Sequence, residues 1–329
     1  MSTRRMIAVV VLVPLLAALA LWAFAWPAAR TAPRDLPLGV AGPPAATAQV
    51  EQGLRQHEGA FELHRYADEG AARAAIENRT VYGAIVVTPR GPELLTASAA
   101  SPVVAQLLQQ AVTRQAAASG AAEVRTVDVV PAPESDPRGA ALSSSVLPLA
   151  LSGIIAGALV TLLGLRGLRA VTALIVAAAL VGLIAVALAH SWLGALTGNW
   201  WAEAGTLALA MLAVSAAVAG LAALTGPAGI GAVAFLVMFL GNPFSAAASA
   251  PQLLPEPVGT IGQWLPPGAS ATLLRSVSFF DGAAATGPAL TLTWWAAVGL
   301  GAVVLGNALK SRTRHATPAT DERALTPVG

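Results

Sequence analysis

Residues Ala170–Ala189 read AVTALIVAAALVGLIAVALA, and residues Thr206–Thr225 read TLALAMLAVSAAVAGLAALT. Neither run contains a charged side chain, and each has the roughly 20 apolar residues needed to span the hydrocarbon core of a bilayer. Neither shows the polar stripe at helical spacing that a soluble helix would turn toward water. Both runs therefore predict helices that cross a membrane.

Similar apolar runs lie on both sides of this pair. They predict further crossing helices at Met6–Trp26, Ser145–Leu165, Gly229–Asn242 and Pro288–Leu309. The Gly229–Asn242 run is short, so we expect it either to extend through the apolar Pro243–Ala248 or to break there. Of the 329 residues 56% are hydrophobic and 11% are charged, against about 25% charged in soluble domains. We therefore expect an α-helical polytopic protein with six transmembrane helices in a lipid bilayer.

The first of these runs has two interpretations. Ala23-Phe24-Ala25 resembles the cleavage site of a signal peptide, which would be removed. However, Met6–Trp26 is longer than the apolar region of about 7–15 residues in a signal peptide. It also ends in Trp22, Phe24 and Trp26, which suit a membrane interface. This favours an uncleaved signal anchor over residues 1–26.

Composition changes abruptly after this helix. Residues 27–144 hold ten of the 19 Lys and Arg residues and 12 of the 17 Asp and Glu residues. Short β-prone runs alternate with helical ones in the order strand, helix, strand, helix, strand, strand, helix, strand, with Asp68 as the cap of the second helix and Val81–Thr88 opening a hairpin. Residues 27–144 therefore predict a small mixed α/β domain between the first two transmembrane helices.

Lys and Arg near the helix ends predict which side each loop occupies. Three basic clusters would be cytoplasmic if the N-terminus is: Arg4 and Arg5, then Arg166 and Arg169 in a tight loop, then Lys310, Arg312 and Arg314. Six crossings would then place residues 27–144 outside and residues 310–329 in a cytoplasmic tail. The five helices within 145–309 would form the rest of the membrane domain of a multi-pass protein of a bacterial plasma membrane.

The last outer loop, residues 242–287, is unusually long and apolar. Prolines break it repeatedly, and Ser270–Phe280 is an apolar run with the single charge Arg275. Such a segment suits a re-entrant or interfacial helix that caps the bundle, the alternative being a plain surface connector. The candidate residues of an outer gate are Trp264, Pro266, Pro267, Gly268 and Arg275.

Several classes of chemistry have little support in this sequence. There is no cysteine and there are only four histidines, so we expect no metal site and no cofactor. The only lysine, Lys310, lacks the glycine that precedes the lysine of a P-loop. No catalytic constellation is visible, and the formal net charge of +2 indicates no affinity for nucleic acid. We expect His190 to have a structural role, and Gly153 and Gly157 form a GxxxG pattern that would let another helix approach closely.

The chain resembles the permeases of type-2 ABC exporters, in particular the YhgE/Pip (phage infection protein) subgroup. The resemblance rests on the order of helix, outer α/β domain and five helices, on the helix at Ala71–Arg79 followed by the strand YGAIVV at Tyr82–Val87, and on LPPGA at Leu265–Ala269 with Arg275. The composition, rich in Ala and Arg, is similar to that of a high-GC actinobacterium.

This resemblance implies a permease subunit that moves an apolar or amphipathic substrate outward. It implies pairing with a second copy or a sister permease, and energy from a separate cytoplasmic ATPase, for which Arg166 and Arg169 are the candidate contacts. The loop Gly164–Arg169 is shorter than the coupling helix of such permeases. The alternative is a receptor or assembly scaffold that does not transport and whose outer domain binds a partner in the cell envelope.

Overall fold

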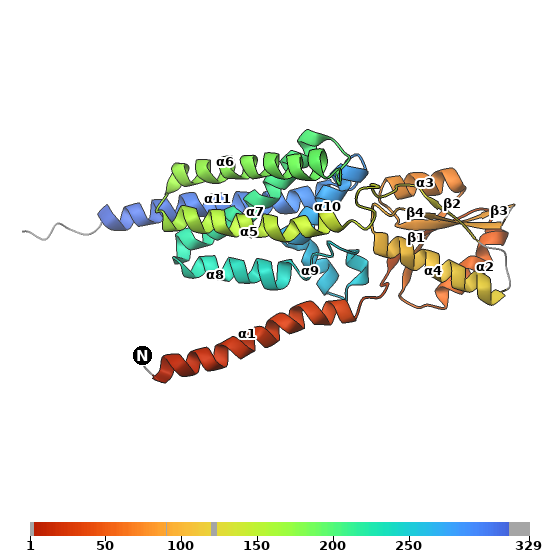
Figure 1. Ribbon diagram of the computed structural model, residues 1–329, viewed down its shortest axis with the longest axis horizontal. Coiled ribbons are helices and arrows are strands. Elements are labelled where there is room, and N and C mark those ends of the chain that lie inside the picture. Colours follow the sequence, from red (N-terminus) through yellow and green to blue (C-terminus); the bar gives the residue numbers. More distant parts are fainter. Residues whose placement is uncertain (1–2, 90, 120–123, 316–329) are drawn as a thin grey trace, which may run out of the picture.

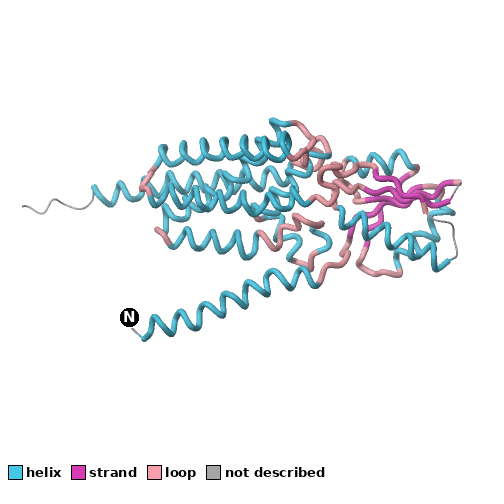
Figure 2. The backbone as a smooth tube through the Cα atoms, in the orientation of Figure 1, coloured by secondary structure: helices cyan, strands magenta, loops and turns pink. Residues whose placement is uncertain are grey.

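The computed structural model describes residues 3–89, 91–119 and 124–315. They form an elongated molecule with a bundle of long helices at one end and an α/β unit at the other (Figures 1 and 2). Most of the expected tail, residues 316–329, lies outside the described residues, as do the side chains of Arg5, Arg312 and Arg314. Three features lie at the bundle end remote from the sheet: the N-terminal end of the first helix, the loop between α5 (Ala140–Leu162) and α6 (Gly167–Val186), and the C-terminal end of α11 (Thr286–His315) (Figure 1).

Five described helices are long and apolar enough to cross a membrane. They are α1 (Thr3–Ala29), α5 (Ala140–Leu162), α6 (Gly167–Val186) with its π-helical continuation η1 (Ala187–Trp192), α7 (Trp200–Thr225) and α11 (Thr286–His315). These helices coincide with five of the six runs that the sequence predicts. The protein is therefore mostly helical and has the helices of a membrane-embedded protein.

The sixth expected helix is as short as its apolar run. α8 (Ala228–Phe235) has eight residues and continues as a π-helix, η2 (Leu236–Gly241), of six residues. The helix ends before Pro243, which has no backbone N–H to donate. Of the two expectations for this run, the structure therefore shows the break. At about 1.5 Å per residue such a helix falls short of the 30 Å hydrocarbon core, so it does not qualify by length as a span.

Helix α7 forms the centre of the bundle and packs against α5, α6 and α11. Its neighbours approach it through glycines. A Cβ added at Gly153 of α5 would lie 2.8 Å from Val214 Cβ, and one at Gly157 would lie 2.6 Å from the carbonyl oxygen of Ser215. Gly182 of α6 is equally close to Ala204. The GxxxG pattern thus does bring a second helix into close contact, and its partner is α7.

The α/β unit is built on a five-stranded sheet with the strand order β2-β1-β3-β4-β5. The strands are β1 (Leu36–Ala41), β2 (Phe61–Tyr66), β3 (Gly83–Thr88), β4 (Gly91–Thr96) and β5 (Arg125–Asp128). β3 and β4 pair antiparallel as the expected hairpin, and the other pairs are parallel. The order of strands and helices is the one that the sequence predicts.

Helices cover both faces of this sheet. α3 (Glu69–Glu77) packs on one face, while α2 (Pro44–Arg55) and α4 (Pro102–Ser119) lie on the other (Figure 1). Asp68 caps α3 as expected, since its Oδ1 accepts a hydrogen bond of 2.8 Å from the Ala71 amide. Alternating apolar residues of the strands fill the two cores between the sheet and its helices.

The segment between η2 and α11 joins the sheet to the bundle. It contains the 3₁₀ turn η3 (Pro251–Leu253), α9 (Val258–Trp264) and α10 (Pro266–Phe279). Phe280, at the end of α10, belongs to the core on the α3 side of the sheet, and Ala250 and Leu253 belong to the core on the other side. α10 is buried along most of its length. α10 therefore packs mainly against the bundle, and its end at Phe280 joins the core of the sheet.

Candidate functional site between the sheet and the outer helices

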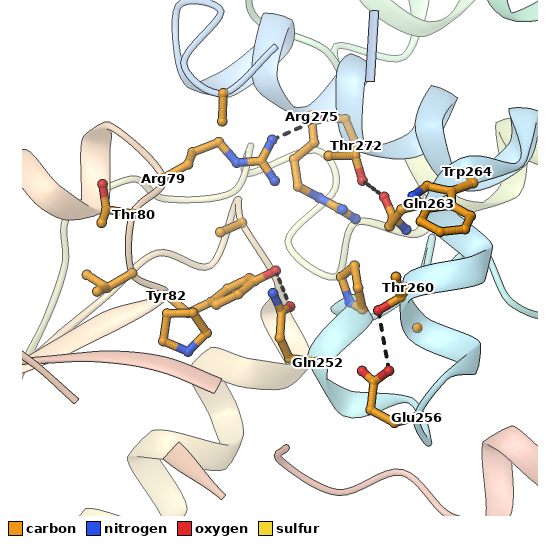
Figure 3. A pocket seen from close by; sticks show the side chains of 16 residues that line it. Arg79, Thr80, Tyr82, Gln252, Glu256, Thr260, Gln263, Trp264, Thr272 and Arg275 are labelled. Carbon is orange, nitrogen blue, oxygen red and sulfur yellow. Dashed lines mark hydrogen bonds between the residues drawn. The ribbon is translucent and has the colours of Figure 1, made fainter. Parts of the chain in front are cut away.

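A cavity of about 390 Å³ lies where the α/β unit meets α9 and α10 (Figure 3). Most of its lining comes from three parts of the chain: the turn between α3 and β3, the η3 turn, and α9 with α10. Pro37, Ala100 and Ala284 complete it. The side chains that can form hydrogen bonds in this lining are Arg79, Thr80, Tyr82, Gln252, Glu256, Thr260, Gln263, Trp264, Thr272 and Arg275. The cavity thus contains many polar groups although it borders an apolar bundle.

Arg79 reaches the cavity from the sheet side. It follows the C-cap Asn78 of α3 and has φ of 58°, which turns the chain sharply from the helix toward β3. Its Nη1 donates to the Thr272 carbonyl oxygen at 3.1 Å and to the Ser276 hydroxyl, both on α10. Its guanidinium also lies over the Phe280 ring, 5.2 Å from the centroid. Burial lowers the pKa of Arg79.

Arg275 enters from α10 on the opposite side (Figure 3). Its side chain is buried, and its Nη2 donates to the Ala247 carbonyl oxygen at 2.9 Å. Burial, and then the like charge of Arg79, lower the pKa of Arg275 to about 10. This guanidinium nevertheless stays charged at neutral pH, because 10 is well above 7. Neither Arg79 nor Arg275 forms an ion pair with a carboxylate of the described residues.

Neutral side chains complete the wall by bonding across the junction. The Tyr82 hydroxyl, whose pKa is raised by burial, donates to Gln252 Oε1 at 2.9 Å and so joins the sheet to η3. The Thr272 hydroxyl donates to Gln263 Oε1 at 2.6 Å and joins α10 to α9. These bonds hold the lining in place without neutralising the two guanidinium groups.

Of the expected gate residues, two line the cavity and three support it. Trp264 and Arg275 lie in the wall, and Trp264 is 68% exposed. Pro266, Pro267 and Gly268 are buried in the first turn of α10, where Pro267 packs against Gly241 at the end of η2. They shape the corner between α9 and α10, and their side chains are not part of the lining.

Arg166 and Arg169 lie at the opposite end of the molecule. Both are exposed, at the N-cap and in the first turn of α6. They therefore share no site with the gate residues. A small cavity of about 120 Å³ beside Arg166 is lined by α5, α6, α7 and α11.

A second polar cluster lies at the sheet end of the bundle. His190 Nδ1 is 2.7 Å from Glu203 Oε2, and Glu203 Oε1 accepts a hydrogen bond of 2.8 Å from the Gly198 amide. Glu203 is fully buried. The structural role expected for His190 is therefore to bond this carboxylate and join η1 to α7. Within the described residues no group of three His, Asp or Glu side chains is placed to hold a metal ion.

Comparison with protein-family models, with curated proteins and with solved structures gives no match. Any function proposed for this chain therefore rests on its own sequence and structure. Sequence reasoning singled out Arg275 as the lone charge of an apolar run, but it missed Arg79, Tyr82, Gln252 and Gln263. Arg79 and Thr272 are 193 positions apart, and Arg79 is one of ten arginines in residues 27–144. No local sequence pattern therefore distinguishes Arg79 as a site residue.

Proposed function

We propose that this chain is the membrane permease subunit of an ABC-2-type exporter, which moves an apolar or amphipathic substrate outward with energy from a separate ATPase. The observation that carries the proposal is the position of α10. It packs against α5, α7 and α11 at the outer end of the bundle, and its end at Phe280 lies in a core of the sheet. Any opening of the bundle at this end must therefore move the α/β unit with it.

The connection is more extensive than a tethered domain requires. Besides the two shared cores, the Ala32 and Arg34 amides donate to the carbonyl oxygens of Leu253 and Gln252, and Arg34 Nη1 donates to Leu253 at 3.0 Å. A receptor or scaffold whose outer domain only captures a partner needs no such coupling. A permease does, because substrate release requires the outer end of the bundle to open while the inner end is closed.

In this proposal the α8–η2 helix is too short to span the hydrocarbon core by itself, and it carries the chain across the membrane a sixth time together with the turn that follows it. It runs alongside α5 from the end remote from the sheet toward the sheet (Figure 1). The two ends of the chain and the α5–α6 loop would then be cytoplasmic, and the sheet extracytoplasmic, in a bacterial plasma membrane. α1 contacts the rest of the protein chiefly at its outer end, where Trp26 packs near Phe244 and Leu254. Its remaining surface is available to lipid and to a second copy or sister permease.

The proposal is tested by purifying the tagged full chain in a mild detergent and identifying what accompanies it. We expect a P-loop ATPase in near-stoichiometric amount. Arg166→Glu combined with Arg169→Glu should release it, because reversing two exposed charges at the inner end opposes docking. Arg114→Glu, which reverses a single charge on the exposed face of α4, should retain it.

Recovery of envelope proteins alone, bound through the α/β unit, would contradict the permease proposal and support the receptor. Retention of the ATPase by the double variant would instead show that Arg166 and Arg169 are not its contacts. The short loop Leu163–Arg166 makes this second outcome informative, since it leaves little else at the α5–α6 turn to dock on.

A further inference from the structure

The cavity between the sheet and the outer helices holds an excess of positive charge. Two of its ionisable lining groups are guanidinium groups, Arg79 and Arg275, against one carboxylate, Glu256, and the phenol Tyr82. Glu256 is exposed, accepts a hydrogen bond of 3.3 Å from the Thr260 hydroxyl, and pairs with neither arginine. Arg275 is buried and Arg79 is half-buried. Two like charges that are partly removed from water without a counter-ion are costly, and a bound anion would reduce that cost.

Both arginines also have N–H groups that donate no hydrogen bond within the described part of the chain. Arg275 bonds only through Nη2 and Arg79 only through Nη1, so the Nε–H and the remaining terminal nitrogen of each have no hydrogen-bond partner among the described residues. Figure 3 shows the two side chains entering the cavity from opposite sides. Planar forks of this kind match the oxygens of a phosphate group better than a lysine does.

We infer that this cavity binds a phosphate group through Arg79 and Arg275. At about 390 Å³ the cavity is large enough for a group bigger than phosphate alone. Gln252 also lines the cavity, and its amide nitrogen, which its bond to Tyr82 does not use, is suited to a hydroxyl group next to a phosphate. The amide of Gln263 already bonds Thr272 and the Ser245 carbonyl oxygen. Glu256 lies at the rim and would weaken binding by repulsion.

The phosphate could be free or belong to a lipid headgroup, and the surroundings of the opening are compatible with both. Trp264 lies exposed in the wall, and its carbonyl oxygen accepts a hydrogen bond of 2.9 Å from Trp295 Nε1. Trp294, next along α11, is also exposed. Tryptophans gather at the level of lipid headgroups. The site does not rest on the transport proposal, because it would bind the same group in a receptor.

Binding is measured on the purified full chain in a non-ionic detergent, with three probes: inorganic phosphate, a short-chain phosphatidylglycerol and the matched diacylglycerol, which lacks the phosphate. We expect one or both phosphate probes to bind and the diacylglycerol not to. Arg275→Gln should weaken binding about 10- to 100-fold, since a hydrogen bond to a charged group is lost with the charge. Arg114→Gln, an exposed arginine on α4, should leave it unchanged.

A second pair of variants tests the inference even if Arg275→Gln does not fold. Thr260 is exposed and lines the cavity. Thr260→Glu adds a second carboxylate to the lining, next to Glu256, and should also weaken binding, whereas Thr260→Gln should keep it. Glu256→Gln should strengthen binding, because it removes the repulsion at the rim.

Binding of phosphatidylglycerol without inorganic phosphate would assign the site to a headgroup, and binding of both would assign it to the phosphate group in either form. The inference is overturned if neither phosphate probe binds, if diacylglycerol binds equally well, or if Thr260→Glu binds as the unaltered chain does. None of these results depends on whether an ATPase accompanies the protein, so this inference and the proposed function can fail separately.

Discussion

At the scale of single residues, the carboxylate of Glu203 illustrates how a buried charge is tolerated at the end of a membrane helix. It sits in the first turn of α7, where the partial positive charge of the helix N-terminus favours an anion. The Gly198 amide and His190 saturate its two oxygens. Removing the carboxylate would leave both of these groups without their partner in a buried site.

Glu203→Ala should therefore lower the free energy of unfolding by about 2–4 kcal/mol. Glu203→Gln should cost less, because an amide oxygen can still accept from the Gly198 amide. The measurement is the thermal midpoint of the purified protein in detergent. Equal midpoints for Glu203→Ala and the unaltered chain would show that the cluster does not stabilise the N-terminal end of α7.

Arg79 and Arg275 illustrate the opposite arrangement. Each is held by neutral oxygens of α10 or of the loop at Ala247, and neither faces a partner of opposite charge within the described part of the chain. This difference from Glu203 is why the first cluster is interpreted as structural and the cavity as a binding site.

At the scale of elements, close packing around α7 depends on small residues, because lipid tails are as apolar as leucine and give helices no hydrophobic reason to associate. Backbones must come near one another for van der Waals contact to accumulate. The glycines of α5 and α6 that face α7 permit this approach.

Gly157→Leu should therefore destabilise the bundle by about 1–3 kcal/mol or more, since its added side chain would meet the Ser215 carbonyl and Val218 on α7. Gly301→Leu is the matched control on α11, where nothing lies within 4 Å of an added Cβ. Both variants are compared by thermal midpoint in the same detergent. Similar losses at the two positions would argue against the α5–α7 contact.

At the scale of the whole molecule, much of the fold follows from patterns that are local in sequence. Apolar length predicts the five long helices, and the alternation of β-prone and helical runs predicts the order of the α/β unit. The π-helical continuation of α8 could not be predicted, because an equally apolar sequence is compatible with a helix that continues and with one that ends.

The site was less predictable because it is assembled from distant parts of the chain. Arg275 stands out as a single charge in an apolar run, whereas Arg79 and Tyr82 become part of the cavity only when α3 and β3 pack on α10. The pairing of His190 with Glu203 has a signal in the sequence. Between Arg169 and Arg275 the ionisable residues are His190, Glu203 and Glu256, and the first two form a pair. Ionisable side chains that are isolated in an apolar stretch are expected to pair with one another.

The central proposal concerns the whole molecule: six crossings would place the sheet and its cavity outside the membrane and the turn between α7 and α8 inside. Because the chain has no cysteine, single cysteines can be introduced and labelled with a maleimide that cannot cross the membrane. The exposed positions Gln110 on α4, Thr225 before α8 and Thr260 on α9 test this claim directly. In intact cells Gln110→Cys and Thr260→Cys should react, while Thr225→Cys should react only after the membrane is permeabilised. Labelling of Thr225→Cys in intact cells, or protection of Gln110→Cys, would contradict the account.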